Sequence, residues 1–299
     1  IMKLYDCFMF SDETMLLKIR LNILHKFVDK FIITEARYLH NGKEKKLNFD
    51  INEFKEFSKK IEYVIVDDQP STIISDEKHQ NESRSKEILI INSLKRENYQ
   101  REMLMRGLEN LDGEDVIMIS DVDEIPNLNN FNLNGIGNNI VIFKQKMFYF
   151  KFNLFYENFD WYGSKAVKKK NFISPQWLRN IKNKNYPFWR LDTFFSKKKY
   201  RNIKFVENGG WHFTCIKKPK EVHQKLLSYL HHQDYENSGI SLNELEKRIS
   251  NKEVLYDHNL DKKNSNKWLS KKKLKKIDLI NLPKYLIDNQ NNFKEWIEK

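Results

Sequence analysis

Short apolar runs alternate with longer segments of mixed polarity along the first half of the chain. Apolar residues recur every three to four positions between residues 15 and 27, which predicts a helix there. A second mixed segment has no proline, and no glycine until Gly107, which predicts another helix over about 82–111. Compact apolar and β-branched runs predict strands over residues 3–10, 30–36, 63–66, 116–119 and 140–150.

Strands that alternate with helices predict an α/β fold, in which a mostly parallel sheet is flanked by helices. The pattern changes after residue 215, where helices are predicted over 221–232 and 242–249 and a region rich in Lys and Asn follows. We therefore expect a catalytic domain over residues 1–215. Residues 216–299 are expected to form a C-terminal helical segment that packs on this domain and ends in a basic tail.

The chain is strongly basic, with 53 Lys and Arg residues against 41 Asp and Glu residues and a formal net charge of +12. Such a balance favours polyanionic partners: nucleic acid, an anionic membrane surface or phosphate-bearing small molecules. Charge alone does not choose among them. The run from Lys262 to Lys276 holds eight lysines, and it is typical either of a surface that lies on anionic lipid or of a solvated tail.

The cysteines and the lengths of the apolar runs bear on the cellular compartment of the protein. Cys7 and Cys215 both lie in apolar stretches, so we expect buried thiols and no disulfide framework. No apolar run approaches the length of a membrane span, and no signal-peptide pattern opens the chain. These features predict a soluble, cytoplasmic protein, for which any membrane contact is peripheral and at the inner face.

Two aspartates separated by one residue follow the apolar run at 116–119. The segment reads Ser120-Asp121-Val122-Asp123-Glu124, and Pro126 ends the regular pattern. Carboxylates at the end of a buried strand are suited to hold Mg²⁺ or Mn²⁺, which keep coordination positions open for phosphate oxygens. A cation there would neutralise the charge that develops on a nucleoside diphosphate leaving group. The same pattern also fits a solvated turn, so the sequence motifs around it must decide between a metal site and a turn.

That context is a series of motifs in a familiar order. The stretch Ile119 to Pro126 (ISDVDEIP) resembles the signature of glycosyltransferase family 17, the β-1,4-mannosyl-glycoprotein 4-β-N-acetylglucosaminyltransferases. Other matching positions are YDCFMF at 5–10, ITEA at 33–36, Arg101, WYGSK at 161–165 and GWHF at 210–213. The likeness runs from about residue 3 to about residue 235. Several motifs in order carry more weight than the Asp-x-Asp triplet alone.

The resemblance implies a GT-A type sheet that binds a UDP-sugar with Mn²⁺ or Mg²⁺ and transfers a sugar, expected to be N-acetylglucosamine, to a glycan acceptor. Asp123 is the expected direct metal ligand, with Asp121 and His212 as further ligands. The strand-end positions and the matching motifs together give the expected donor contacts, which are Glu35, Asp67, Arg101, Asp121 and Lys165. Asp68, beside Asp67, is a further strand-end carboxylate.

The resemblance also implies inversion at the anomeric carbon. Inversion needs a carboxylate base that deprotonates the acceptor hydroxyl. Asp160 is preferred because the neighbouring Trp161 offers a surface on which the acceptor sugar would stack. Glu124 and Glu207 remain alternatives, since the choice depends on geometry.

Two other functions compete with glycosyl transfer. A phosphotransfer or phosphatase enzyme also uses Asp-x-Asp at a strand end, but the haloacid dehalogenase type places the pair after its first strand. Here the pair follows several predicted strands and helices. A nucleic-acid-binding protein would suit the charge, but the sequence has no zinc pattern, RNP-like motif or helix-turn-helix signature. We therefore expect a nucleotide sugar and a glycan as partners, and no nucleic acid.

Overall fold

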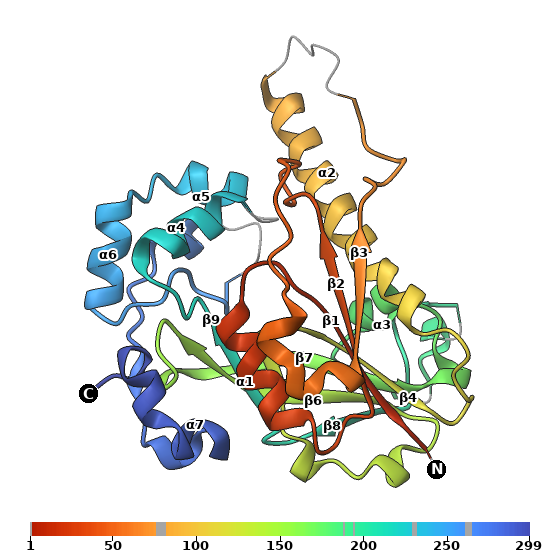
Figure 1. Ribbon diagram of the computed structural model, residues 1–299. Coiled ribbons are helices and arrows are strands. Elements are labelled where there is room, and N and C mark those ends of the chain that lie inside the picture. The colour runs from red at the N-terminus through yellow and green to blue at the C-terminus, as the bar shows by residue number, and fades with distance from the viewer. Residues whose placement is uncertain (1, 76–81, 188, 194, 229–231, 261–264) are drawn as a thin grey trace.

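One mixed sheet runs through the molecule (Figure 1). The computed structural model describes residues 2–75, 82–187, 189–193, 195–228, 232–260 and 265–299. Ten strands are present in this part of the chain: β1 (Leu4–Met9), β2 (Lys30–Ala36), β3 (Ile61–Val66), β4 (Val116–Asp121), β5 (Glu124–Pro126), β6 (Ile140–Tyr149), β7 (Leu154–Lys168), β8 (Ile203–Val206), β9 (Gly210–Thr214) and β10 (Lys275–Lys276). Eight of them follow the order β3-β2-β1-β4-β7-β6-β9-β5, while β8 pairs with β6 and β10 pairs with β7.

The sheet has a parallel half and a largely antiparallel half. The strands β3, β2, β1 and β4 are all parallel. The nearly continuous burial of β1, β2 and β4 explains their compact apolar runs, whereas the edge strand β3 is mostly half-buried. From β4 onward the direction changes, because β7 is antiparallel to both β4 and β6. In Figure 1 the first three strands stand upright while β6 and β7 lie across them, so the sheet curls.

Helices cover both faces of the sheet. The α-helices are α1 (Thr14–Leu24), α2 (Glu82–Glu102), α3 (Pro175–Asn180), α4 (Pro219–Ser228), α5 (His232–Ser238), α6 (Leu242–Ser250) and α7 (Lys284–Asp288). The 3₁₀ helices are η1 (Ile51–Lys60), η2 (Met103–Gly107), η3 (Leu128–Asn130), η4 (Leu133–Ile136), η5 (Lys169–Asn171), η6 (Leu191–Thr193), η7 (Ser265–Leu269), η8 (Leu279–Asn281) and η9 (Gln290–Trp296). The predicted α/β fold with C-terminal helices is therefore confirmed.

Each face of the sheet has its own apolar core. Leu4 and Phe8 of β1 pack in one cluster with Leu17 of α1 and Leu286 of α7. Tyr5 and Cys7 of β1 point the other way and pack in a second cluster that contains residues of η2 and α3. Figure 1 shows α1 in front of the sheet. This alternation along a single strand places different helices on opposite sides of the site described below.

Most predicted elements lie within a few residues of their observed bounds. The predicted helix over 82–111 is α2 followed by the 3₁₀ turn η2, which ends at Gly107. A Cβ on Gly107 would lie 2.4 Å from Ile32 Cγ2, so glycine is needed where this turn crosses β2. The predicted helix over 221–232 corresponds to α4 and the start of α5, and residues 229–231 lie outside the described residues.

The C-terminal segment packs closely on the sheet. Leu282, Leu286 and Phe293 join the core cluster that contains α1, and β10 pairs with β7. The Lys-rich run is folded where it is described, because Lys272, Lys273 and Lys275 form ion pairs at 2.7–2.8 Å with Asp257, Glu253 and Glu157. Residues 261–264 of this run lie outside the described residues. The domain boundary at residue 215 stays a prediction.

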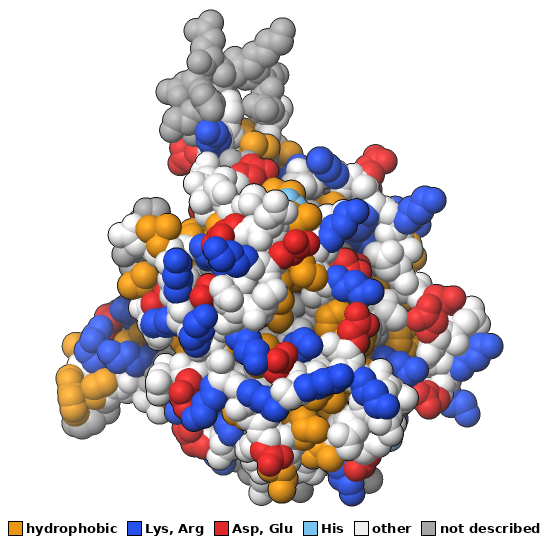
Figure 2. Space-filling view, turned by 90° about the vertical axis from the view of Figure 1, so that its left-hand side faces the viewer, with side chains coloured by type: hydrophobic (Ala, Val, Ile, Leu, Met, Phe, Trp, Pro, Cys, Tyr) orange, Lys and Arg blue, Asp and Glu red, His pale blue; other side chains and the backbone are white. Residues whose placement is uncertain are grey.

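Two further expectations concern the thiols and the membrane. Cys7 and Cys215 are both buried and free, as predicted. Among the helices that the structure describes, none is both long enough and apolar enough to cross a bilayer. Figure 2 shows that Lys and Arg side chains on the face turned to the viewer are scattered and interspersed with carboxylates, so this face carries no single basic stripe.

Candidate active site

The Asp-x-Asp segment forms a tight turn at the carboxyl end of β4. Asp121 is the last residue of β4, Val122 and Asp123 make the turn, and Glu124 begins β5. β4 lies between parallel β1 and antiparallel β7. The turn is therefore placed where the parallel half of the sheet meets the antiparallel half, at the edge where open α/β sheets bind ligands.

A buried ion pair between α1 and β1 fixes the backbone of this turn. The Arg20 guanidinium donates to both carboxylate oxygens of Asp6, at 2.6 and 2.8 Å, and both side chains are fully buried. Arg20 Nη1 donates to the carbonyl oxygens of Asp121, at 3.3 Å, and of Glu124. The guanidinium also lies over the ring of Phe8. Because a guanidinium presents its donors in a rigid fork, Arg20 holds the turn in one conformation.

Asp121 lies between two arginines. Arg179 Nη2 is 2.6 Å from one carboxylate oxygen of Asp121, and Arg101 Nη2 is 3.4 Å from the other. Burial alone would raise the pKa of Asp121, but the two guanidinium groups lower this pKa to about 2. The Asp121 side chain is one-third exposed, at 34 %. Asp121 is thus an ionised carboxylate at the surface of the turn, with two cations beside it.

Glu124 is completely buried and accepts four hydrogen bonds. Its Oε1 accepts from Trp161 Nε1 at 2.7 Å and from Arg179 Nη2 at 2.6 Å. Its Oε2 accepts from Arg179 Nη1 at 2.8 Å and from the backbone N–H of Asp121 at 2.9 Å. Both carboxylate oxygens of Glu124 are therefore already occupied by donors from the turn, α3 and β7. A Cβ on Gly163 would lie 2.9 Å from Glu124 Cδ, so the glycine makes room for this carboxylate.

Asp123 faces an imidazole. His212 Nε2 on β9 lies 3.5 Å from Asp123 Oδ1, and both side chains are largely buried. The ring of Trp161 stacks on His212, with centroids 4.5 Å apart. His212 Nδ1 is buried and has no hydrogen-bond partner. Within the described residues, no group of three or more His, Cys, Asp and Glu side chains gathers into a metal site.

The position of Trp161 bears on the predicted acceptor site. Its ring covers His212 rather than standing open, and its indole N–H is bound to Glu124. His258 from the C-terminal segment also contacts the Trp161 ring edge-on, with centroids 6.3 Å apart, and packs against Tyr256. Residues beyond 215 therefore complete the surroundings of the site.

Lys165 lies near the turn but is directed at backbone. Its ammonium donates to the carbonyl oxygens of Arg179, at 2.9 Å, and Ile181, at 2.6 Å. Burial, reinforced by Arg179, lowers the pKa of Lys165 to about 7. Both acceptors lie at the end of α3, the helix that carries Arg179. In this arrangement Lys165 holds the end of α3, and through it Arg179, in place; its contact with a donor stays a prediction.

Glu35 and Asp67 do not contact the turn. The buried Glu35 carboxylate accepts hydrogen bonds from Lys45, from the backbone N–H groups of Asn48 and Phe49, and from the Tyr63 hydroxyl. It therefore anchors the loop that follows β2. Asp67 is exposed and pairs with Arg37 at 2.5 Å. Their roles in binding a donor remain predictions.

Asp160 and Glu207 lie together, away from the turn. Both pair with Lys144 Nζ, at 3.1 and 3.2 Å, and both are more than half exposed. Asp160 immediately precedes Trp161 on β7, and neighbouring strand residues point to opposite faces of a sheet. Since Trp161 faces His212 and Glu124, Asp160 faces away from them. The structure thus brings together Asp121, Asp123, Glu124, Arg101 and His212, and leaves Asp160 and Glu207 outside this group.

Sequence reasoning missed Arg179, the residue with the most contacts to the turn. The start of its helix carries a readable signal, because Ser174 caps α3 and Pro175 occupies its first turn. Nothing local shows that a six-residue helix meets a carboxylate 58 positions earlier in the chain. Asp6 carried a signal only through its place in the matching motif at 5–10.

A comparison with protein families decides the class of this enzyme. The model described as Glycosyltransferase family 17 matches residues 1–297. The chain belongs to glycosyltransferase family 17. The match covers the C-terminal segment as well, so the family likeness extends well beyond residue 235. No curated protein matches this glycosyltransferase.

Family membership identifies the chemistry as transfer of a sugar from a donor to an acceptor. It overturns the alternative reading of the Asp-x-Asp pair as part of a phosphatase. In this glycosyltransferase two aspartates, two arginines and one histidine meet at the carboxyl end of β4, and they come from the β4–β5 turn, α2, α3 and β9.

Proposed function

We propose that this glycosyltransferase is a metal-dependent, inverting enzyme of the GT-A type that moves N-acetylglucosamine from a UDP-sugar to a glycan acceptor. The observation that carries the proposal is the pairing of Asp123 with His212 beside the two arginines that hold Asp121. The identity of the sugar and the inversion rest on the motif resemblance at 119–126 and 161–165.

Asp123 and His212 are the residues that would hold Mn²⁺ or Mg²⁺. A carboxylate and an imidazole suit Mn²⁺, and both cations are commonly bound by one or two protein ligands plus substrate phosphates. The donor set at the turn fits this pattern, because it offers two such ligands close together and no larger cluster among the described residues. When bound, the cation would neutralise charge on the diphosphate leaving group.

Arg179 and Arg101 are the residues that would bind the diphosphate. Guanidinium groups match phosphate oxygens in geometry and charge, and both already meet at one carboxylate of the turn. Asp121 would then keep the two guanidinium groups oriented. The buried Glu124 would hold Arg179 in place through the two hydrogen bonds that it accepts from it.

The arrangement favours none of the three predicted bases. Asp160 and Glu207 lie with Lys144 on the other side of β7. Glu124 is completely buried, and both its carboxylate oxygens already accept hydrogen bonds from Arg179. We therefore assign Glu124 the role of a positioning residue.

A thermal-shift screen of nucleotides tests this proposal. A ligand that binds only the folded state stabilises it by about 2.7 kcal/mol at 100 times its Kd. We expect UDP and a UDP-sugar to raise the melting temperature when Mn²⁺ is present, and other nucleoside diphosphates to do so less. Stabilisation by UDP that is equal with and without Mn²⁺, or no stabilisation by any nucleotide, contradicts it.

Matched aspartate variants locate the effect. Asp123→Asn is expected to remove the Mn²⁺-dependent part of the shift, because the amide is a weaker ligand than the carboxylate. Asp12→Asn is the control, since this exposed carboxylate pairs with Lys217, which is not part of the turn. Loss of the Mn²⁺ effect in both variants, or in neither, would argue against a cation at Asp123.

A further inference from the structure

The segment between α3 and β8 exposes an unusual amount of apolar surface. Trp189 is 67 % exposed, Leu191 is 68 % exposed and Phe195 is 91 % exposed, and all three fall within seven residues. Single exposed apolar residues are normal on protein surfaces, but a group of large ones marks a site of interaction. We call residues 182–201 the basic aromatic segment.

The same segment carries a large positive charge. It contains Lys182, Lys184, Arg190, Lys197, Lys198, Lys199 and Arg201, which are seven basic residues, against the single acidic residue Asp192, for a net charge of +6. Asp192 is shared between Arg190 and Lys199, at 2.8 and 2.7 Å. The ring of Tyr186 lies within 6 Å of three of these cations. The positive charge thus surrounds the exposed rings.

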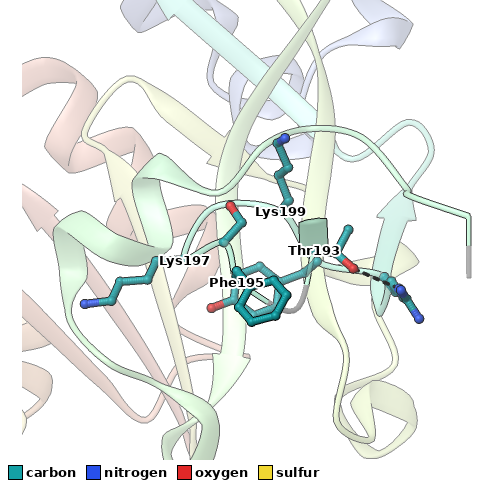
Figure 3. Close-up of a pocket in the computed structure, with 7 residues that line it drawn as sticks. Thr193, Phe195, Lys197 and Lys199 are labelled. Atoms are coloured by element: carbon teal, nitrogen blue, oxygen red, sulfur yellow. Dashed lines mark hydrogen bonds between the residues drawn. The ribbon is translucent and has the colours of Figure 1, made fainter. Parts of the chain in front are cut away.

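A cavity of about 540 Å³ opens in this segment (Figure 3). Its lining comprises three cations, two hydroxyl side chains and two rings, namely Lys197, Lys199, Arg201, Thr193, Ser196, Phe195 and Tyr200. Arg201 Nε donates to Thr193 Oγ1 at 2.9 Å. In Figure 3 the Phe195 ring lies at the centre, and Lys197 and Lys199 extend in different directions from it. Cations and hydroxyl groups together suit a phosphate group.

Exposed aromatic and aliphatic side chains among lysines and arginines are the pattern of a segment that lies in a membrane interface. Tryptophan and phenylalanine enter the headgroup region, and each nearby lysine or arginine is attracted to anionic lipid. The geometry points to an anionic membrane surface as the partner of the basic aromatic segment. Trp189, Leu191 and Phe195 enter the headgroup layer, and the cavity beside Phe195 receives a lipid phosphate.

The Lys-rich run at 262–276 is the competing surface for this role. In its described part, Lys272, Lys273 and Lys275 are neutralised by carboxylates of the same chain. Its described part also exposes less apolar surface than the basic aromatic segment, because Trp268 is buried and Leu269 is the one exposed large apolar side chain. Of the described parts of these two surfaces, the basic aromatic segment is the one that combines a net positive charge with several exposed apolar side chains.

The basic aromatic segment is linked to the active site along the chain. It follows α3 directly, and α3 carries Arg179, which contacts Asp121. The inference does not depend on the donor or on a metal, because membrane binding needs neither.

Cosedimentation of the full chain with vesicles tests the inference. We expect binding to vesicles of equal parts phosphatidylglycerol and phosphatidylcholine, and little binding to phosphatidylcholine alone. The variant Trp189→Ser/Leu191→Ser/Phe195→Ser should bind at least about tenfold more weakly, because three apolar side chains no longer enter the interface. The variant Lys197→Gln/Lys199→Gln should lose about fivefold per lysine.

Matched variants elsewhere control for general changes in surface character. Leu269→Ser/Ile280→Ser removes two other exposed apolar side chains, and Lys271→Gln/Lys276→Gln removes two other lysines. Both should bind vesicles as the unaltered chain does. Equal loss in the controls, unaltered binding by the serine variant, or preference for oligonucleotides over vesicles would overturn the inference. Loss of donor binding with vesicle binding intact would count against the proposed function only.

Discussion

Arg179 and Glu124 form a bidentate ion pair, with Nη1 to Oε2 at 2.8 Å and Nη2 to Oε1 at 2.6 Å, inside the turn that carries the Asp-x-Asp motif. The same Nη2 also reaches Asp121 at 2.6 Å. One guanidinium thus joins a buried carboxylate to an exposed one. The two hydrogen bonds to Glu124 fix the direction of the Arg179 guanidinium. Asp121, which is partly exposed, accepts a hydrogen bond from the same Nη2.

Replacing Arg179 tests whether its guanidinium binds the donor. Arg179→Lys keeps the charge but loses the bidentate geometry, and we expect the donor KM to rise about 10- to 100-fold, the equivalent of about 1.5–3 kcal/mol. Initial-rate kinetics with varied donor and saturating acceptor measure it. Arg190→Lys, in an exposed pair with Asp192, is the control and should leave KM unchanged. A fall in kcat at constant KM would argue for a different role.

Gly163→Ala should disturb the hydrogen bonds between Glu124 and Arg179, because Gly163 packs against the Glu124 carboxylate. The new Cβ would lie 2.2 Å from Gln145 Oε1 and 2.9 Å from Glu124 Cδ, so one of these groups must move. We expect a loss of about 1–3 kcal/mol in the free energy of unfolding, together with a raised donor KM. Gly113→Ala is the matched control, because its Cβ would meet nothing closer than 3.6 Å. Urea unfolding and donor kinetics that are unaltered in Gly163→Ala would contradict this account.

The buried pair of Asp6 and Arg20 should contribute strongly to stability. Asp6→Asn leaves a buried guanidinium without its carboxylate, and we expect a loss of about 3–5 kcal/mol in the free energy of unfolding. Urea denaturation measures it. Glu62→Gln, which breaks the half-exposed pair with Lys30, is expected to cost less than about 1 kcal/mol. If the two variants lose equal stability, Arg20 does not hold the turn as described.

Glu13 should make stability depend on acid pH. Burial alone would raise the pKa of Glu13, but Lys225 and Lys217 lower it to about 2. Because the pKa is lower in the folded than in the unfolded chain, the stabilisation is complete above about pH 4.5 and is lost as the pH falls towards 2. This interval corresponds to about 3 kcal/mol.

The measurement is urea unfolding of the unaltered chain and of Glu13→Gln across this pH range. The difference in their free energies of unfolding should shrink as the pH falls from 5 to 2, about the interval over which Glu13 takes up its proton. Comparing the two proteins cancels the contributions of the other carboxylates. A difference that stays constant with pH would show that Glu13 is not stabilised as an anion by Lys225.

The parallel half of the sheet could be predicted from sequence for a physical reason. Its inner strands are covered on both faces, so they contain compact apolar runs such as residues 31–33 and 116–119. β7 was missed because it is the opposite case. Its middle residues are partly exposed and polar, from Glu157 to Asp160, and its pairing with β6 is interrupted by bulges.

The site was predictable where its chemistry is local in sequence. Asp121, Asp123 and Glu124 lie on one turn, and the end of the apolar run at 116–119 predicts where that turn begins. The side of a strand on which Asp160 points depends on pairing register, which a one-residue shift reverses. Arg179 reaches Asp121 only through the tertiary fold. Residues whose role depends on long-range packing leave no local signal.

The parts of the site leave the ribosome in a fixed order. Asp6 and Arg20 emerge first and can pair within a short stretch of nascent chain, whereas the turn that they hold is made about a hundred residues later. His212 emerges later still, on β9, and the aromatic contact from His258 comes after it. A polypeptide released before β9 would carry the complete Asp-x-Asp motif and yet lack the imidazole that faces Asp123.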